Sequence, residues 1–489
     1  MPSGPVERRG RISSPGEAHP ADQADSADQA RRTMSPSIPN MDSLRRALTG
    51  EVIAQGDAGW DAARQAWNLT ADQSPPLVVL ADSAADIEAT VQFAVANGLR
   101  VAPQSTGHGA SSMGDLAATI LLKTSRLAAV SVDPKQRTAT VGAGALWSDV
   151  VAPAAKHGLV GLHGLSAAVG VAGYVLGGGI GWLSRRDGFA SSHVRAFETI
   201  GVDGKADRIE AGSDPELFWA LCGGGGRPVI VTSFELELFE LREAFAGALM
   251  WPIEEAESVL AAWREWVASV PHEVTSTIRL LRFPALPTVA ENLRGRAMVA
   301  VLLAFAGTGE RGAELVAPLR AVGVPDVDTL ATISGAALAD VAGDPTDPTP
   351  ALGYATLIDH IGTDETDALL ALAGPGVDTP FASVEIRHLG GALRDPTTDP
   401  GAAGRLDAEG LLYCTARVSS PQSEEAIRAA QREARDRFAP FTGARDTILT
   451  FDERRPMRGA FEPDVADRIE AICRKRDPDG LFVSNHTAG

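Results

Sequence analysis

Apolar and polar positions between residues 75 and 110 follow a pattern that predicts a strand, a helix and a second strand. The run "LVVLA" is typical of a short buried strand. Apolar residues then recur at helical spacing between Ser83, a favoured N-cap with Asp86 three residues later, and Gly98, a favoured helix end. "LRVAP" predicts the second strand, which leads into the loop "QSTGHGA". Loops that leave strand ends beside helices are common ligand positions.

Residues 118–243 continue with alternating strands and short helices. We expect a helix over residues 147–156, a hairpin that turns at Asp203 and Gly204, and a helix capped by Asp214. Glycine is dense in three stretches, "QSTGHGA", "GLSAAVGVAGYVLGGGIG" and "CGGGGRP".

The pattern changes at about residue 245. "EEAESVLAAWREWVAS", "TDETDALLALAG" and "SEEAIRAAQREARDRF" predict helices, and "TSTIRLLRF", "AMVAVLLAFAG", "SVEIRHLGG" and "LLYCTARVSS" predict strands. Such a mixture favours an antiparallel sheet covered by helices, an α+β arrangement. "AGDPTDPTPALG" and "RDPTTDPGAAG" predict surface loops. The chain then ends in a helix, a turn and an extended tail.

Composition narrows the function. The net charge is −19 over 489 residues, which argues against nucleic acid and anionic membranes as partners. No apolar run is long enough to cross a bilayer. The three cysteines lack metal-ligand spacing, so we expect no metal, no disulfide and a cytoplasmic location. Residues 1–40 are polar and rich in Pro, Ser, Ala and Asp, which predicts a disordered N-terminal extension.

The glycine stretches point to a nucleotide cofactor. Glycine lets the backbone approach a ligand closely and point N–H groups at it, as a diphosphate requires. Tight turns are the alternative explanation for any one stretch. "GGGIGW" follows several strands rather than the first strand of a βαβ unit, so a nicotinamide dinucleotide is disfavoured. No nucleophile-elbow motif suggests a hydrolase.

Four segments together resemble the berberine-bridge-enzyme-like (BBE-like) FAD-linked oxidases of the vanillyl-alcohol oxidase superfamily. They are "PPLVVLADSAADIEATVQFAVANGLRVAPQSTGHG", "GLSAAVGVAGYVLGGGIGWLSRRDG", "DPELFWALCGGGGRPVIVTSFELEL" and "DPDGLFVSN". The resemblance implies an α+β fold with a two-part PCMH-type FAD-binding domain. Residues 41–243 and 440–489 would form that domain, and residues 244–439 would form an inserted substrate-binding domain.

The resemblance gives His108 a role. In this family the corresponding loop cradles the FAD diphosphate, and its histidine is bonded to the 8α carbon of the flavin. An ordinary loop histidine is the alternative. Doubly linked members carry a cysteine where Ser166 stands here, and a serine oxygen is no equivalent nucleophile. We therefore expect a single link at His108 or none.

The same resemblance assigns further cofactor contacts. Arg227 departs from the family's usual "GGGGNFG", so its role is open. Contacts to the diphosphate are expected from Ser105, Thr106, Gly107, Gly109 and Ala110. Contacts to the flavin or its ribityl chain are expected from Ser166, Val169, Gly170, Gly173, Gly178, Gly179, Gly181 and Trp182. Val231 is expected to contact the adenine, and Asn485, in the C-terminal tail, is expected to contact the flavin ring.

The catalytic base is expected on the strands that cover the flavin. The late strand stretch "TILTFDERR" lacks the Tyr and Asn of the family motif. Tyr413, Glu385 and His388 are the candidates, and period-two alternation puts Tyr413 opposite Cys414. Arg387 could hold a substrate carboxylate or an ionised base. A packed strand tyrosine and solvated charges are the alternatives. His163 and His193 are interpreted as structural loop histidines.

These observations predict an FAD-dependent oxidoreductase. The expected form is an oxidase that moves hydride from a small alcohol, sugar or secondary metabolite to flavin N5, and electrons to O2. An FAD-dependent dehydrogenase with another acceptor, and a flavin-binding protein with a degenerate site, are the alternatives. We expect a monomer or homodimer.

Overall fold

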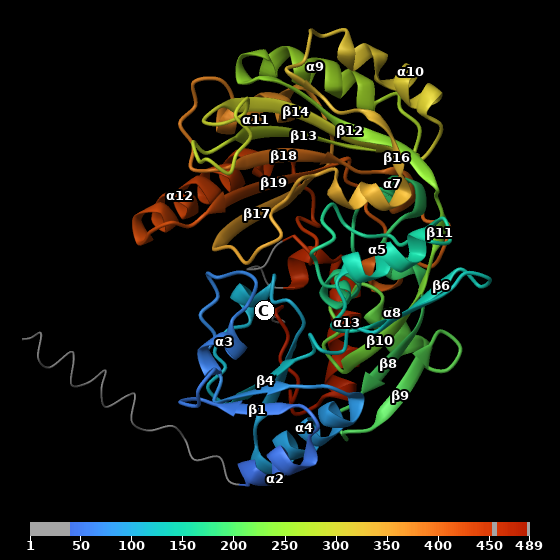
Figure 1. Ribbon diagram of the computed structural model, residues 1–489, viewed down its shortest axis with the longest axis vertical. Coiled ribbons are helices and arrows are strands. Elements are labelled where there is room, and N and C mark those ends of the chain that lie inside the picture. Colours follow the sequence, from blue (N-terminus) through green and yellow to red (C-terminus); the bar gives the residue numbers. More distant parts are fainter. Residues whose placement is uncertain (1–39, 452–456, 487–489) are drawn as a thin grey trace, which may run out of the picture. The chain divides into compact units, whose positions relative to one another are not determined.

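A computed structural model describes residues 40–451 and 457–486 of the chain. The predicted disordered extension therefore lies, apart from its last residue, outside the described residues, as does the "DERR" of the late strand stretch. The described residues form three larger sheets and one two-stranded sheet, with helices packed around them (Figure 1).

The first sheet carries the opening strand–helix–strand pattern. Its strand order is β1-β2-β4-β3, with β2, β4 and β3 parallel, so β4 separates the two predicted strands. Ser83 accepts a hydrogen bond from the Asp86 backbone N–H, and Gly98 ends the helix with φ +65°, as predicted. The elements are α2 (Met41–Ala47), β1 (Glu51–Ala54), α3 (Trp60–Arg64), β2 (Leu77–Leu80), α4 (Ala84–Asn97), β3 (Arg100–Gln104) and β4 (Thr119–Lys123).

The second sheet is antiparallel, in the order β5-β6-β10-β8-β9. The predicted hairpin joins β8 to β9, and Asp214 caps α8 by accepting a hydrogen bond from the Leu217 N–H. The elements are β5 (Val130–Asp133), β6 (Thr138–Gly142), α5 (Trp147–Ala155), α6 (Val171–Leu176), α7 (Ser184–Asp187), β8 (Val194–Ile200), β9 (Ala206–Glu210), α8 (Pro215–Leu221) and β10 (Ile230–Glu237), with β7 (Leu159–Val160) paired to β11 (Phe239–Glu240).

The third sheet is the predicted antiparallel one, in the order β15-β12-β14-β13-β18-β19-β17, with β16 also paired to β12. Helices α9 to α12 cover one face with an apolar core (Figure 1). The elements are β12 (Glu243–Pro252), α9 (Ala256–Val267), β13 (Val274–Arg282), β14 (Ala297–Phe305), α10 (Gly309–Arg320), β15 (Val327–Asp328), β16 (Ala331–Ser334), β17 (Ala351–Ile358), α11 (Thr363–Ala373), β18 (Ser383–His388), β19 (Gly410–Arg417) and α12 (Pro421–Phe438).

The C-terminal segment returns to the first two sheets. Helix α13 (Pro463–Arg476) packs on α8, with an ion pair of 2.6 Å between Lys475 and Glu216. The tail then pairs with β3, because Phe482 bridges Val101 in parallel. This return brings the end of the chain beside the "QSTGHGA" loop, which follows β3.

Candidate functional site

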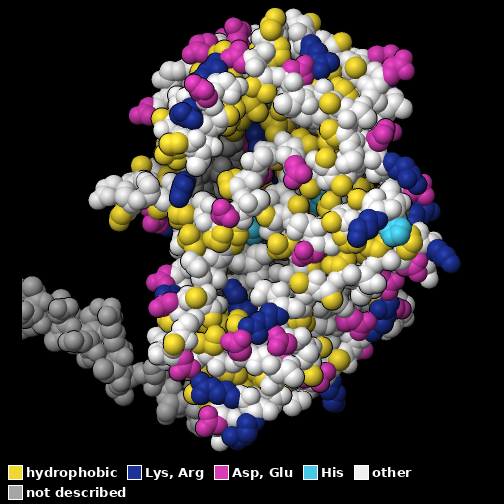
Figure 2. Space-filling model, in the orientation of Figure 1, with side chains coloured by type: hydrophobic (Ala, Val, Ile, Leu, Met, Phe, Trp, Pro, Cys, Tyr) yellow, Lys and Arg dark blue, Asp and Glu magenta, His cyan; other side chains and the backbone are white. Residues whose placement is uncertain are grey.

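A cavity of about 1570 Å³ separates the third sheet from the glycine-rich loops of the other two sheets. The molecular surface is hollowed below the third sheet (Figure 2). All three glycine stretches contribute to the lining, as do β13, β18 and β19 and the tail at Asn485. The volume exceeds the roughly 300–1,000 Å³ of an ordinary small-molecule pocket, so a dinucleotide and a substrate can share it.

The loop at residues 105–110 is clamped from two sides. Gly107 has φ +83°, and a Cβ there would lie 2.8 Å from the Cβ of Ala66. A Cβ on Gly109 would lie 2.5 Å from Asn485 Nδ2. The two glycines are therefore needed for close packing, and they bring the loop, residue 66 and the C-terminal tail together.

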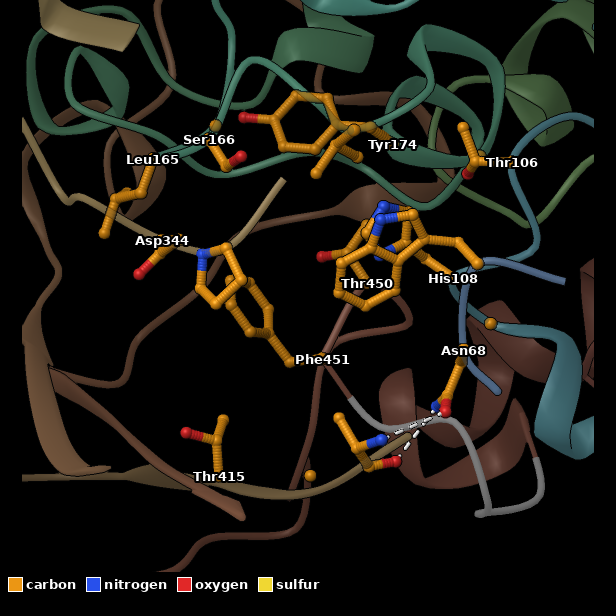
Figure 3. Close-up of a pocket in the computed structure, with 18 of the residues that line it drawn as sticks. Asn68, Thr106, His108, Leu165, Ser166, Tyr174, Asp344, Thr415, Thr450 and Phe451 are labelled. Atoms are coloured by element: carbon orange, nitrogen blue, oxygen red, sulfur yellow. Dashed lines mark hydrogen bonds between the residues drawn. The ribbon is translucent and has the colours of Figure 1, made fainter. Parts of the chain in front are cut away.

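His108 is held in this loop with one ring nitrogen unsatisfied. Its imidazole stacks on Trp67 with ring centroids 3.9 Å apart and hydrogen-bonds to the backbone of Ala168. The buried Nε2 has no hydrogen-bond partner. Burial lowers the pKa of the imidazole to about 4, against the Ala168 hydrogen bond, which raises it. His108 is therefore neutral at pH 7, and it is one of the residues that line the cavity (Figure 3).

The second glycine stretch contributes lining residues from both of its halves. Ser166, Val169, Gly170 and Gly173 are lining residues, and a Cβ on Gly170 would lie 2.9 Å from Ser105 Oγ. This contact shows why glycine is needed where the first two loops meet.

Four residues expected at the flavin lie outside the cavity lining: Gly178, Gly179, Gly181 and Trp182. A Cβ on Gly179 would meet the Tyr174 ring at 2.4 Å, and one on Gly181 would meet the His163 carbonyl at 1.8 Å. Gly178 has φ +103°, and Trp182 is buried in the core. These four residues pack the loop from behind rather than line the cavity.

The third stretch contributes Arg227 and Val231 to the lining. Arg227 Nη1 is buried without a hydrogen-bond partner. The structure therefore places the unusual residue of "CGGGGRP" in the cavity lining.

Several buried polar atoms of the lining residues lack partners, which tests the fit to a nucleotide. A bound molecule rich in hydrogen-bonding groups would satisfy them, whereas an empty apolar cavity would leave each at a cost of roughly 1–3 kcal/mol. These atoms are Ser105 Oγ, His108 Nε2, Tyr174 Oη, Arg227 Nη1, Ser383 Oγ and Thr450 Oγ1. The lining fits FAD in size and in polarity.

A row of three side chains crosses the third sheet at the cavity wall. The strand register pairs Arg279 with Glu385, and Glu385 with Tyr413. Glu385 is ion-paired to Arg279, and its Oε1 lies 2.6 Å from Arg387 Nε. Burial favours the neutral acid, but the two guanidinium groups hold the pKa of Glu385 below its ordinary value. Glu385 is therefore ionised and ion-paired with both arginines, and it is a weak base.

Arg387 and Tyr413 stand over the cavity beside Phe451. The Arg387 guanidinium lies 4.7 Å from the Phe451 ring centroid and 5.4 Å from that of Tyr413. All three residues line the cavity. Cys414 is buried in the core on the helix side of the sheet, so the predicted alternation at Tyr413 and Cys414 is correct.

His388 does not reach the cavity. It is the end residue of β18 and, by the same alternation, points away from Glu385 and Arg387. Its Nε2 lies 2.7 Å from Arg185 Nη1, and burial holds the imidazole pKa well below its usual value. The expectation that His388 serves as a catalytic residue is corrected accordingly.

Two lining features were missed from the sequence. Tyr174, whose ring packs edge-on against Trp147 at 5.6 Å, presents its hydroxyl to the cavity. The segment "AGDPTDPTPALG", expected as a surface loop, lines the cavity from Ala342 to Thr349 and then begins β17. Its Pro and Asp content does not distinguish a surface turn from a cavity rim. Its position at the cavity follows from the pairing of Thr349 with Asn68, which are far apart in the sequence.

Other predicted absences concern the described residues alone. Within residues 40–451 and 457–486, no group of three or more His, Cys, Asp or Glu side chains could hold a metal ion. His163 and His193 hydrogen-bond to the carbonyls of Gly164 and Asp187, both at 2.7 Å. Across the same described ranges, helices long and apolar enough to span a membrane are absent.

Comparison with known proteins agrees with this geometry. Residues 75–210 match a family model described as an FAD binding domain. The chain is 30% identical over 256 residues to (R)-6-hydroxynicotine oxidase from Paenarthrobacter nicotinovorans. That stretch covers 51% of this chain and 56% of the relative, so the chain spans about half of the relative's length.

Two solved structures share the whole architecture. Over 89% of this chain and 96% of the other, 6-hydroxy-D-nicotine oxidase from Arthrobacter nicotinovorans superposes with a TM-score of 0.77 and 25% identity. BBE-like 1 from Physcomitrella patens covers 92% of this chain and 98% of its own, with a TM-score of 0.79 and 16% identity, which shows the fold alone.

These findings define first a class, an FAD-binding protein with the PCMH-type α+β fold. Within that class, the chain is similar to FAD-linked oxidoreductases, 6-hydroxynicotine oxidase among them. The resemblance and the fold that the sequence predicted are confirmed.

Proposed function

We propose that this protein is an FAD-dependent oxidase, in which the cavity holds FAD covalently at His108 and admits a small organic substrate. Its substrate would be an alcohol, a sugar or a secondary metabolite, and O2 would be reduced to H2O2. The observation that carries the proposal is the unpartnered Nε2 of His108 at the point where the glycine-rich loops meet. Bound FAD supplies a hydride acceptor at N5.

The chain holds the cofactor mainly through backbone. The loop at residues 105–110 carries no cationic side chain, so its N–H groups would meet the diphosphate charge. Ser166, Val169, Gly170 and Gly173 would contact the flavin or ribityl chain, Val231 the adenine, and Asn485 the ring. The glycines behind the cavity and Trp182 would support these contacts from the core.

The division into domains follows from the same contacts. Residues 41–243 and 440–489 would form the FAD-binding part, and residues 244–439 the substrate-binding part. The pairing of Phe482 with Val101 supports this division, because it joins the tail to the strand that leads into the His108 loop.

The proposed covalent link balances with O2 as the oxidant. His108 Nε2 would become bonded to the 8α carbon of the flavin, one methyl C–H hydrogen and one imidazole N–H hydrogen would be lost, and O2 would be reduced to H2O2. Only a neutral imidazole offers the lone pair, and burial keeps His108 neutral at pH 7. Because Ser166 supplies no thiolate, we expect a single link.

Tyr413 is the favoured base among the three candidates. His388 lies outside the cavity lining, and Glu385 is held ionised between two arginines. Tyr413 faces the cavity, and the positive charge of Arg387 beside its ring stabilises negative charge on the phenol oxygen. Ion pairs at the wall join Arg279 to Asp344 and Glu385, and Arg387 to Glu385.

The test is acid precipitation of the purified protein. Yellow flavin is expected to stay with the wild-type pellet and to be released to the supernatant from H108A. H157A is the matched control, because His157 is exposed and lies outside the lining of the large cavity. Flavin that stays with the H108A pellet, or leaves the wild-type pellet, contradicts the covalent assignment.

Activity is tested on the same preparations. Bleaching of the flavin absorbance by alcohols and sugars under nitrogen reports substrate oxidation, and oxygen consumption then separates an oxidase from a dehydrogenase. Y413F is expected to slow the bleaching by about 10²–10⁴-fold, the usual contribution of a general base. A colourless protein that takes up no FAD would refute the proposal, and a yellow one that no substrate bleaches would favour a flavin-binding protein.

A further inference from the structure

Trp67 joins the His108 loop to the opposite rim of the cavity. Its backbone N–H donates to the Thr106 carbonyl at 2.9 Å, and its carbonyl accepts from the Thr349 N–H at 3.1 Å. Its indole Nε1 donates to the Thr346 carbonyl at 3.1 Å. One residue is thus fixed at three points, two on the rim segment of residues 342–349 and one on the loop that carries His108.

The indole of Trp67 lies against one face of the His108 imidazole. The ring planes are only 22° apart, with centroids 3.9 Å apart. Stacking fixes the plane of the imidazole, and the Ala168 hydrogen bond fixes its rotation in that plane. Together the two contacts fix the ring of this cavity-lining residue, with Nε2 buried and without a hydrogen-bond partner.

We infer that Trp67 is a positioning residue for cofactor attachment, because its anchored indole fixes the plane of the His108 imidazole in the cavity wall. The inference rests on the covalent link proposed above. Formation of the bond requires the nitrogen lone pair to approach one carbon along one direction, and a freely turning imidazole would spend little time in that orientation. The bond made and the bonds broken are those already given, with O2 as the oxidant.

Two substitutions of Trp67 distinguish the contribution of its aromatic face from that of its indole N–H. W67F keeps a ring against His108 and loses the hydrogen bond to Thr346. W67L keeps apolar bulk and loses the flat face. If positioning is the role, W67F should resemble the wild type and W67L should not. A role limited to anchoring the rim segment would make the two variants alike.

The experiment follows attachment rather than turnover. Protein produced in riboflavin-limited auxotrophic cells is mixed with FAD in air, and acid-stable flavin is measured over time. W67L is expected to attach flavin about three- to tenfold more slowly than the wild type, the range that the loss of one aromatic pair predicts. W67F is expected within about twofold of the wild type.

W60L is the matched control. Trp60 also donates its indole N–H to a carbonyl, that of Pro75 at 3.1 Å, but it lies outside the cavity lining. Thermal melting and the Kd for non-covalent FAD are measured for each variant. If W67L does not fold, W67M takes its place.

Each outcome decides one claim. Slow attachment in W67L alone, with unchanged FAD affinity, supports positioning. Equal rates in W67L and the wild type, or equal slowing in W67F and W67L, overturn it while leaving the covalent link intact. A wild-type protein that never forms acid-stable flavin instead refutes the link on which the inference rests.

Discussion

Replacement of Glu385 by Gln should destabilise the fold by about 3 kcal/mol. The substitution keeps the shape of the side chain and removes the charge that bridges Arg279 and Arg387, both nearly buried. Breaking a buried ion pair on one side costs roughly 3–5 kcal/mol. The low end applies here, because Asp344 still pairs with Arg279 at 3.2 Å, and Arg387 borders the cavity.

Thermal unfolding gives the measurement. At about 2.1 cal/mol/K per residue, a chain of 489 residues has an unfolding entropy near 1 kcal/mol/K, so E385Q should lower Tm by about 3 °C. E433Q is the control, since Glu433 and Arg437 form an exposed pair at 2.9 Å. Such a pair contributes about 0.5 kcal/mol, less than 1 °C.

The pH dependence sharpens the same prediction. The folded-state pKa of Glu385 is lowered, so its contribution is complete above the ordinary pKa of 4.5 and is lost as the pH falls through the folded value. The Tm gap between wild type and E385Q should therefore be constant above about pH 6 and narrow in acid. A Tm of E385Q equal to that of wild type at pH 7 would refute the ion-pair reasoning.

Three further predictions concern backbone contact and buried bases. G181A should cost more than about 4 kcal/mol and yield little folded protein, because the new Cβ would meet the His163 carbonyl at 1.8 Å, whereas G212A, with open space, should express normally. Flavin attachment at His108 should be independent of pH between 6 and 8 and fall as the pH approaches about 4, where the imidazole becomes protonated; a fall centred on pH 6.5 would show an unburied ring. Burial lowers the pKa of Lys123 to about 8, so the unfolded chain binds more protons than the folded chain between pH 8 and 10.5. The free energy of unfolding of the wild type should therefore rise with pH in that window relative to that of K123M. Parallel pH profiles of the two proteins in urea denaturation would contradict this.

Local sequence rules predicted the elements that have clear ends. The helix between Ser83 and Gly98 and the helix capped by Asp214 form as expected, because cap chemistry acts within a few residues. Strand β12 was not predicted, since "EAFAGALMWP" is apolar on both faces and has no period-two signal. The order of strands in the sheets could not be predicted from the sequence either, because no local pattern encodes the pairing that inserts β4 between β2 and β3.

The part of the site that close backbone packing forms could be predicted from the sequence. His108 was found because glycines on both sides mark a loop that must pack closely, and Gly107 and Gly109 do so against Ala66 and Asn485. Gly181, which the resemblance assigned to the flavin, instead leaves room for the His163 carbonyl. Glycine content reports close approach of some atom, and the identity of that atom depends on tertiary structure.

The cavity wall depends on register in the same way. Arg279, Glu385 and Tyr413 lie far apart in the sequence and meet only because β13, β18 and β19 pair with those residues opposite one another. Register also decides which face each side chain takes, so His388, three residues beyond Glu385, is directed to Arg185 instead of the cavity. The ion pairs of Glu385 with Arg279 on the neighbouring strand and Arg387 on its own favour this register over a one-residue slip of β18, which would carry Glu385 and Arg387 into the apolar core under the helices. The charged residues on the substrate side of the cavity therefore also favour the strand register of the sheet that carries them.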